Sequence, residues 1–347
     1  MEPGDRTPPL AGRERLSVVL ATFQGDRFLA EQLETLRRQT RLPDELVVVD
    51  DASADATVQV VRSFARTAPF PVELVAREDH RGTGATFEEG LRRASGDIIF
   101  ICDQDDRWRP EKVAVMADRM AQHPEALLAI SDAVLIDAVG NRLSRSRLRV
   151  AGLGSRQRAA LAEDPLGQFL ARQVVSGCTA ALRAELVPAV VPFPVGLHPA
   201  LGDVMYDRWI SLVAAAAGPV LCVPERLVEY RIHRGQQVGI PALPARRLLP
   251  QTALRVGQFV ATRDERVGRS QYHRAHLEEI RKRLEVAGLD TGDSELRLRM
   301  ADEHLRVREQ VAASRRRAVL AARHAVDEDG YRRFALGWAT ATADLVR

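Results

Sequence analysis

Short apolar runs rich in β-branched residues alternate with segments of helical periodicity through the first hundred residues. The runs with strand character fall at residues 16–21, 45–49, 72–76 and 97–102. The segments between them that repeat apolar side chains at helical spacing fall at residues 28–39, 57–65 and 86–94. Strands that alternate with helices predict an α/β fold with a Rossmann-like, mostly parallel sheet, whose ligands bind at the carboxyl ends of the strands. Functional residues are therefore expected just after residues 22, 50 and 102.

The alternation becomes less regular beyond Trp108. Helical periodicity returns at residues 111–122 and 205–217. Further strand-like runs fall at residues 127–131, 176–183 and 220–223, the last of them running on toward Arg231. A turn at Gly140 and Asn141 opens an arginine-rich connection that reaches about residue 165. We expect these elements to complete the same domain.

The character of the chain changes near residue 241. Pro241, Pro244 and Pro250 mark a linker, and the chain after it is charged and helical in pattern, with few β-branched runs. The predicted organisation is a flexible N-terminal tail at 1–14, one large α/β domain at 15–240 and a helical C-terminal region at 241–347.

Composition narrows the class of protein. The chain has 347 residues, of which 46% are hydrophobic and 28% charged, as in ordinary globular proteins. The formal net charge of +3 gives no overall attraction to polyanions, so nucleic acid is not an expected partner. The first residues lack the basic and apolar regions of a signal peptide, and the apolar stretch at 212–223 is shorter than the about 20 residues that cross a bilayer. We expect a cytoplasmic protein that is at most peripheral to a membrane.

The most specific pattern is the acidic run Asp103-Gln-Asp105-Asp106, which directly follows an apolar strand. Carboxylates this close together repel one another unless a cation neutralises them, and hard oxygen ligands suit Mg²⁺ or Mn²⁺ that bridges to phosphates. The run therefore predicts a metal-assisted pyrophosphate site. The competing interpretation is a solvated acidic turn that caps the helix at Glu111, and the buried strand before the run favours the functional one.

A second polar cluster, Asp50-Asp51-Ala-Ser53, also lies at the end of an apolar strand. One carboxylate there can accept a hydrogen bond from a pyrimidine imide or a ribose hydroxyl. Ser53 and Asp55 are also good caps for the helix that follows. Taken alone, this cluster leaves a nucleotide site and a capping turn equally open.

Three further features are weaker. Asp207 stands near a helix start and His233 follows a strand, and each taken alone is more often a cap or a satisfied polar residue than a functional group. The glycines Gly82 and Gly84 suggest a dinucleotide fingerprint. They follow the third strand and not the first, and the final glycine is missing, so we interpret them as a turn and helix start.

Seven segments, taken in order, carry a family resemblance: SVVLATFQGDRFLAEQLETLRRQT, LVVVDDASAD, GDIIFICDQDDRWRPEK, ISDAVLIDAVGN, VVSGCTAALRAEL, YDRWISLVAAAAG and LVEYRIHRGQQVG. From about Ser17 to Gly239 the chain resembles family 2 glycosyltransferases of the GT-A fold, and within them the bacterial rhamnosyltransferase-like group. Several motifs in the expected order are far more specific than any one of them.

The resemblance implies a role for each matching position. Thr22 and Asp50 would hold the nucleotide base and ribose, with Asp51 and Ser53 shaping that turn. Asp103 and Asp105 would form the metal-binding DxD element, with Asp105 the direct metal ligand and Asp103 nearer the ribose. His233 would complete the metal or diphosphate site, and Asp207 would be the catalytic base.

The resemblance also implies the reaction and its partners. It implies inverting transfer of a sugar, such as rhamnose from dTDP-rhamnose, from a nucleotide diphosphate donor to a hydroxyl of a glycan or polyprenol-linked saccharide. Mg²⁺ or Mn²⁺ would be the cofactor, and cell-surface polysaccharide synthesis would be the setting. The chain departs from the group in having Tyr206 and Arg208 beside Asp207 where the group has His and Trp, and His80 and Thr86 where it has Asn. These departures leave the donor sugar open.

Three other functions compete with this interpretation. A sugar nucleotidyltransferase would need a glycine- and arginine-rich loop after the first strand, where this chain has Thr22-Phe-Gln-Gly25. A nicotinamide oxidoreductase would need the glycine fingerprint that is missing. A nucleotide-sugar-binding module without turnover would have little reason to keep Asp105, Asp207 and His233 together.

Overall fold

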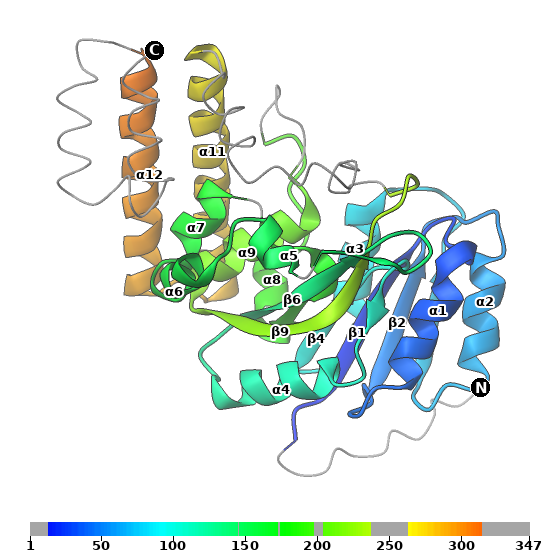
Figure 1. Ribbon diagram of the computed structural model, residues 1–347. Helices are drawn as coiled ribbons and strands as arrows, with labels where there is room; N and C mark the ends of the chain where they lie inside the picture. Colours follow the sequence, from blue (N-terminus) through cyan, green and yellow to red (C-terminus); the bar gives the residue numbers. More distant parts are fainter. Residues whose placement is uncertain (1–12, 145, 173, 198–203, 237–262, 314–347) are drawn as a thin grey trace.

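The computed structural model describes residues 13–144, 146–172, 174–197, 204–236 and 263–313. The strands of these ranges are β1 (Leu16–Thr22), β2 (Glu45–Asp50), β3 (Val72–Ala76), β4 (Ile98–Cys102), β5 (Arg107–Trp108), β6 (Leu128–Ile136), β7 (Arg142–Ser144), β8 (Ala180–Arg183) and β9 (Val220–Arg231). They form one sheet in the order β3-β2-β1-β4-β8-β6-β9-β5, with β7 paired to β6. Helices flank this sheet on both faces (Figure 1).

The first half of the sheet is parallel, as the alternation of strands and helices predicts. β1 pairs in parallel with both β2 and β4, and β2 pairs in parallel with β3. Helices α1 (Asp26–Arg37), α2 (Thr57–Ala65) and α3 (Thr83–Arg93) connect these strands. The carboxyl ends of β1, β2 and β4 therefore meet at one edge, where Thr22, Asp50 and Asp103 lie.

Burial explains why these strands read as continuous apolar runs. Alternate residues of a strand point to opposite faces of the sheet. In β1, Val19 packs into the core shared with α3 and α9 (Tyr206–Ala217), whereas Val18 and Leu20 pack into the core shared with α1 and α4 (Lys112–Gln122). Both faces are covered, so both sets of side chains must be apolar.

The second half of the sheet is mixed. β8 enters between β4 and β6 and runs antiparallel to both, whereas β6 and β9 are parallel. The strand expected from residue 176 begins only at Ala180, because residues 177–179 form the 3₁₀ turn η1 (Gly177–Thr179). The arginine-rich connection contains three short helices, α5 (Arg147–Val150), α6 (Ser155–Glu163) and α7 (Pro165–Ala171), and α8 (Val187–Val190) follows β8.

The described part of the C-terminal region, residues 263–313, is helical, with α11 (Arg263–Ala287) and α12 (Gly292–Ala313) side by side (Figure 1). The rest of the region predicted at 241–347 lies outside the described residues. Both helices contact α9. The apolar residues that they contribute to the core next to Trp209 are Leu277, Ile280, Leu284, Leu298, Ala301 and Leu305. α11 and α12 therefore share a hydrophobic core with the helix that carries Asp207.

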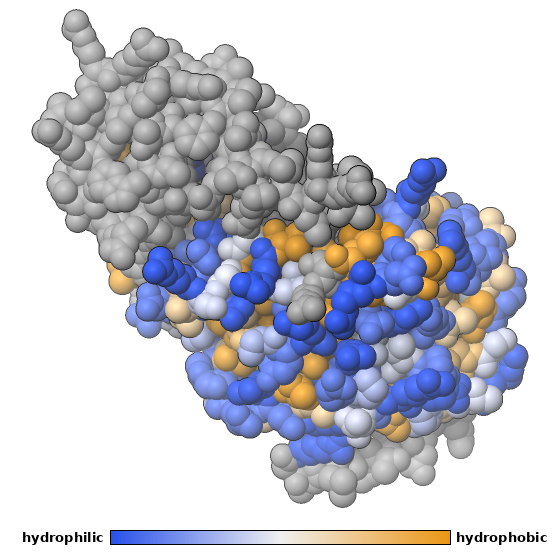
Figure 2. Space-filling view, in the orientation of Figure 1, coloured by the Kyte–Doolittle hydropathy of each residue, from blue (hydrophilic) through white to orange (hydrophobic). Residues whose placement is uncertain are grey.

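The described surface is mainly polar. On the face that Figure 2 shows, hydrophilic residues cover most of the coloured area and hydrophobic residues form smaller patches. Among the helices of the described ranges, none is both long enough and apolar enough to span a membrane.

Candidate active site

The turn after β2 is held by a closed set of hydrogen bonds. The Thr22 hydroxyl donates to Asp50 Oδ1 at 2.8 Å, and the Ser53 hydroxyl donates to the same oxygen at 2.6 Å. The Ser53 backbone N–H donates to Asp50 Oδ2 at 2.8 Å. Both carboxylate oxygens of Asp50 thus accept hydrogen bonds from within the chain. The residue is almost fully buried, and these bonds hold the turn in place.

Asp51 points the other way, toward the N-terminus of α3. Its carboxylate accepts hydrogen bonds from the backbone N–H groups of Arg81 and Gly82, at 2.9 and 2.7 Å. Arg77 pairs with it at 3.1 Å and His80 Nδ1 lies 2.9 Å from it. Gly82 precedes α3 with a φ of 87°, so the glycine-rich segment is a turn and helix start, as predicted.

Gln104, within the acidic run, forms hydrogen bonds to the loop after β1. Gln104 accepts from the Phe23 backbone N–H and donates to the Phe23 carbonyl, both at 2.9 Å. A Cβ on Gly25 would lie 2.1 Å from Gln104 Oε1, so glycine allows this close approach. The two loops that the sequence assigns to nucleotide and metal are therefore joined.

The side chains of Asp105 and His233 are in contact. Their Oδ2 and Nε2 atoms lie 2.8 Å apart, although the two residues are far apart in sequence. Arg231 holds this arrangement together, since its Nε donates to the Asp105 carbonyl at 2.7 Å and its backbone N–H donates to Asp106 Oδ1 at 2.9 Å. The buried guanidinium also pairs with Glu31 at 2.6 Å and lies over the Phe28 ring.

Asp103 lies deeper, against α9. The Tyr206 hydroxyl donates to its Oδ1 at 3.1 Å. Burial, together with the nearby Asp105 carboxylate, raises the pKa of Asp103 to about 7. Gly177 makes room for this contact, because a Cβ there would lie 2.1 Å from the Tyr206 hydroxyl. Asp103 is therefore poised to take up a proton unless a cation or a ligand donor lies beside it.

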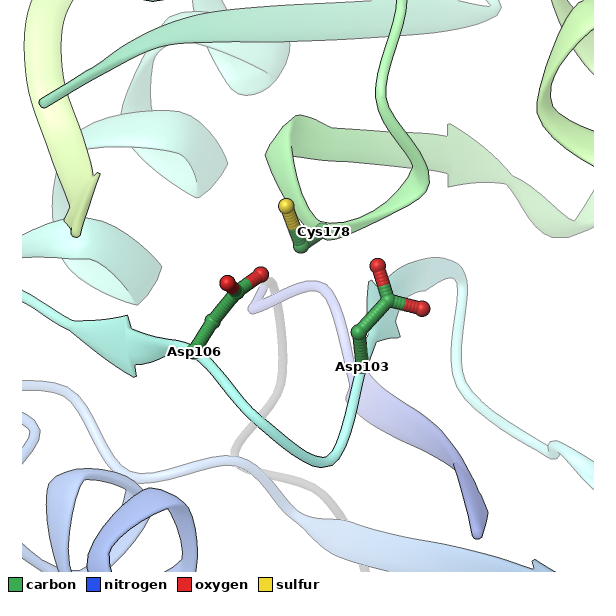
Figure 3. Close-up of side chains that lie close together, drawn as sticks. All are labelled: Asp103, Asp106 and Cys178. Atoms are coloured by element: carbon green, nitrogen blue, oxygen red, sulfur yellow. The ribbon is translucent and has the colours of Figure 1, made fainter. Parts of the chain in front are cut away.

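A second group of potential metal-binding atoms lies behind the acidic run. Asp103, Asp106 and Cys178 each place one ligand atom within 4.8 Å of the others, with Asp103 and Asp106 at either end of the loop after β4 (Figure 3). Burial raises the pKa of both Asp106 and Cys178. A protonated thiol is a poor ligand for Mg²⁺ or Mn²⁺, which prefer oxygen, so this group fits the expected cation less well than Asp105 with His233.

Lys112 lies fully buried beneath the same loop. Its Nζ donates to the Cys178 carbonyl at 2.6 Å and lies 3.2 Å from the centre of the Trp108 ring. Burial lowers the pKa of Lys112 to about 7. The lysine therefore ties Trp108, in β5, to the 3₁₀ turn η1 before β8.

Asp207 occupies the first turn of α9. Its Oδ1 accepts from the Arg208 backbone N–H at 2.7 Å, while the residue that precedes the helix, Met205, gives no side-chain cap. Burial raises the pKa of Asp207 to about 6. A carboxylate with this pKa is ionised at neutral pH and is a stronger base than an exposed one.

One cavity of about 620 Å³ brings most of the predicted site together. The predicted residues that line it are Thr22, Asp51, Asp103, Asp105, Asp207 and His233. Asp50 and Ser53 are not among the described lining residues, so their part in nucleotide binding stays a prediction that would act through the shape of the turn.

Sequence reasoning missed several residues of the site. Local patterns do not reveal residues whose contacts are with segments far along the chain. These residues are Gln104, Arg231, Tyr206 and Lys112. Arg147, from α5, also lines the cavity. Because it lies in the arginine-rich connection, the sequence alone does not distinguish it from arginines on the surface.

Part of the chain is similar to a known protein family. Residues 17–187 match the model of "Glycosyl transferase family 2". An uncharacterized protein of Mycobacterium bovis is 25% identical over 220 residues, which are 63% of this chain and 59% of that protein. An uncharacterized glycosyltransferase of Nostoc is 24% identical over 224 residues, 63% of this chain and 65% of that protein. The chain thus spans about three fifths of the length of these curated relatives.

A solved structure supports the fold. The crystal structure of S. aureus TarS 1-349 in complex with UDP-GlcNAc aligns with 95% of this chain and 90% of its own, with 15% sequence identity and a TM-score of 0.51. The shared architecture is the GT-A fold, with a mostly parallel sheet flanked by helices. The segment from residue 17 to residue 187, which matches the family 2 glycosyltransferase model, carries β1 to β4 and the acidic loop of this fold.

Proposed function

We propose that this protein is an inverting, metal-dependent glycosyltransferase that moves a sugar from a nucleotide diphosphate donor to a hydroxyl of a glycan or lipid-linked saccharide. The observation that carries the proposal is the convergence of Asp105, His233 and Asp207 on one cavity beside the Thr22 turn. The family match and the structural similarity to TarS, whose crystal holds UDP-GlcNAc, support it.

The residues at the acidic loop fit a divalent cation. Asp105 and His233 present an oxygen and a nitrogen 2.8 Å apart, with the pKa of neighbouring Asp103 raised by burial. A cation held there would remove the repulsion between these carboxylates. Carboxylate oxygen suits both Mg²⁺ and Mn²⁺, and the imidazole favours Mn²⁺ of the two. Bound Mn²⁺ or Mg²⁺ would supply positive charge to offset that of the departing diphosphate.

Asp207 would act as the general base. Its carboxylate would take the proton of the acceptor hydroxyl while that oxygen attacks the anomeric carbon from the side opposite the diphosphate, in a single displacement with inversion. General base catalysis typically contributes about 10²–10⁴-fold. The remaining acceleration would come from positioning, in which Gln104 and Arg231 hold the two loops at a fixed separation.

The finer assignments are part of the same proposal. The resemblance to the rhamnosyltransferase-like group favours dTDP-rhamnose as donor and cell-surface polysaccharide as product. The catalytic domain would end near residue 240. The helical region after it would serve the domain by packing on α9, and a peripheral position at the inner face of the membrane would suit a polyprenol-linked acceptor.

The test is nucleotide release from a panel of dTDP-, UDP- and GDP-sugars by the purified full-length chain with Mn²⁺. The expected result is release of a nucleoside diphosphate from one donor, lost when EDTA removes the cation. Release of pyrophosphate would indicate a nucleotidyltransferase instead. Donor binding without release, even with saccharide acceptors present, would indicate a binding module.

A further inference from the structure

Arg147 is a buried cation whose side chain forms no salt bridge or hydrogen bond with the described part of the chain. The residue is 9% exposed and lines the cavity, and its Nε makes no hydrogen bond. Its backbone is firmly placed, because Ser146 caps α5 and the neighbouring Leu148 N–H donates to Asp132 at 2.9 Å. The guanidinium is thus held at the cavity wall by a fixed backbone.

An unpaired guanidinium at such a position is costly. Arginine stays charged in proteins, and burial of a charge without a partner opposes folding. The other deeply buried arginines beside the site avoid this cost. Arg231 pairs with Glu31, and Arg77 pairs with Asp51 and Glu89. The contrast indicates that the partner of Arg147 arrives with a ligand.

The charged residues that line the cavity indicate that a ligand of Arg147 would be an anion. Burial raises the pKa of Asp207, and the Arg208 N–H and the positive charge of Arg147 oppose that rise, so Arg147 lies within electrostatic reach of Asp207. The other charged residues on the described lining are Asp51, Asp103, Asp105, His233 and the exposed Arg27. Arg147 is therefore the buried permanent cation among these residues.

We propose that Arg147 binds an oxyanion, a phosphate or carboxylate group of a substrate, inside the cavity and on the side of Asp207. The inference rests on the proposed function for the identity of the substrates. Two substrates can bring this group: the donor through its diphosphate, or the acceptor through a phosphate or an acidic sugar. The planar guanidinium is suited to either, because it donates two parallel hydrogen bonds to such groups.

The variants are Arg147→Gln, which removes the charge, and Arg147→Lys, which keeps the charge but loses the planar fork. Arg149→Gln is the matched control, since Arg149 is an exposed arginine on the same short helix. Melting temperature without ligand is measured first. The measurement is made at pH 5, where Asp207 is largely protonated and gains little from the positive charge of Arg147. Removal of a buried charge without a hydrogen-bonded partner should then leave the melting temperature unchanged or higher, whereas removal of a structural contact would lower it.

Binding is then measured by calorimetry in two arms, on the full-length chain. The donor arm titrates dTDP, UDP, GDP and inorganic pyrophosphate with Mn²⁺. The acceptor arm titrates glycerol phosphate and methyl glucuronoside in the presence of saturating Mn²⁺ and nucleoside diphosphate. A lost charge-assisted hydrogen bond should weaken binding by about tenfold or more in Arg147→Gln and by less in Arg147→Lys.

Each outcome decides the inference. Weakening confined to the donor arm assigns the oxyanion to the diphosphate, and weakening confined to the acceptor arm assigns it to the acceptor. Wild-type affinities in both arms, losses no larger than those of Arg149→Gln, or a lowered melting temperature would overturn the inference. If the wild type binds no nucleotide, the proposed function fails, while the pyrophosphate titration still reports on Arg147.

Discussion

Replacement of Asp207 by asparagine should make the protein more stable and nearly inactive at the same time. Burial raises the pKa of this carboxyl from 3.8 to about 6. A shift of two units corresponds to about 3 kcal/mol of penalty on the charged form in the folded protein. The favourable interaction of a carboxylate with the first turn of α9 offsets about 0.3–1 kcal/mol of this in practice. We expect Asp207→Asn to gain about 2 kcal/mol or slightly more of unfolding free energy at pH 7.5.

The pH dependence of this gain has a definite sign. Below pH of about 4 the Asp207 carboxyl is protonated in both the folded and the unfolded chain, so the wild type suffers no penalty. Between about pH 4 and pH 6 the unfolded chain releases this proton while the folded chain still binds it, so the wild type loses stability across this window and the loss is complete above about pH 6. The advantage of the asparagine variant should therefore be near zero at pH 4 and full above pH of about 6.

The assay combines urea unfolding at pH 4 and pH 7.5 with donor affinity and transfer rate on the same preparation. Asp293→Asn, an exposed first-turn aspartate of α12, is the matched control. Asparagine cannot take a proton, so turnover should fall by about 10²-fold or more with donor affinity unchanged. Retention of more than about a tenth of wild-type turnover would remove Asp207 as the base. A loss of stability at pH 7.5 that is absent at pH 4 would refute the electrostatic reasoning.

Four further outcomes follow from the structure. Asp105→Asn should abolish both transfer and the Mn²⁺ dependence of donor binding in calorimetry; an unchanged metal dependence would contradict the role of Asp105. Gly177→Ala should displace the Tyr206 hydroxyl, which would lie 2.1 Å from the new Cβ, and lower the transfer rate about tenfold or more, whereas Gly292→Ala, with open space around it, should not. The pH profile of kcat/KM in wild type should fall about tenfold per pH unit below about 6, as Asp207 takes up a proton; a flat profile down to pH 5 would contradict this. Deletion of residues 241–347 should give aggregated or poorly folded protein by light scattering and circular dichroism, because Leu277, Ile280 and Leu284 bury against α9; a monomeric, cooperatively melting product would contradict it.

The sequence predicts the first half of the fold well for a physical reason. Strands covered on both faces must be apolar throughout, so β1, β2 and β4 stand out as continuous runs, and their helices show regular periodicity. The same regularity places Thr22, Asp50 and Asp103 at one edge of the sheet before any coordinates are known. The residues expected to bind a metal are suggested by the acidic run that directly follows β4.

The second half is harder to predict because its elements are short or depend on distant partners. α5 has four residues and β5 has two, too few for periodicity to show. β8 carries no local sign that it runs antiparallel between β4 and β6. In the same way, Arg231 and Gln104 act through contacts with remote loops, and Arg147 differs from a surface arginine only in its burial.

The central claim is a single displacement at the anomeric carbon with Asp207 as base. Proton NMR of the first-formed product, with the donor identified by nucleotide release, tests it most directly. The prediction is a product whose anomeric configuration is opposite to that of the donor sugar, formed only with Mn²⁺ or Mg²⁺ present. A product that retains the donor configuration would contradict the claim, because retention requires a second displacement that Asp207 alone does not provide.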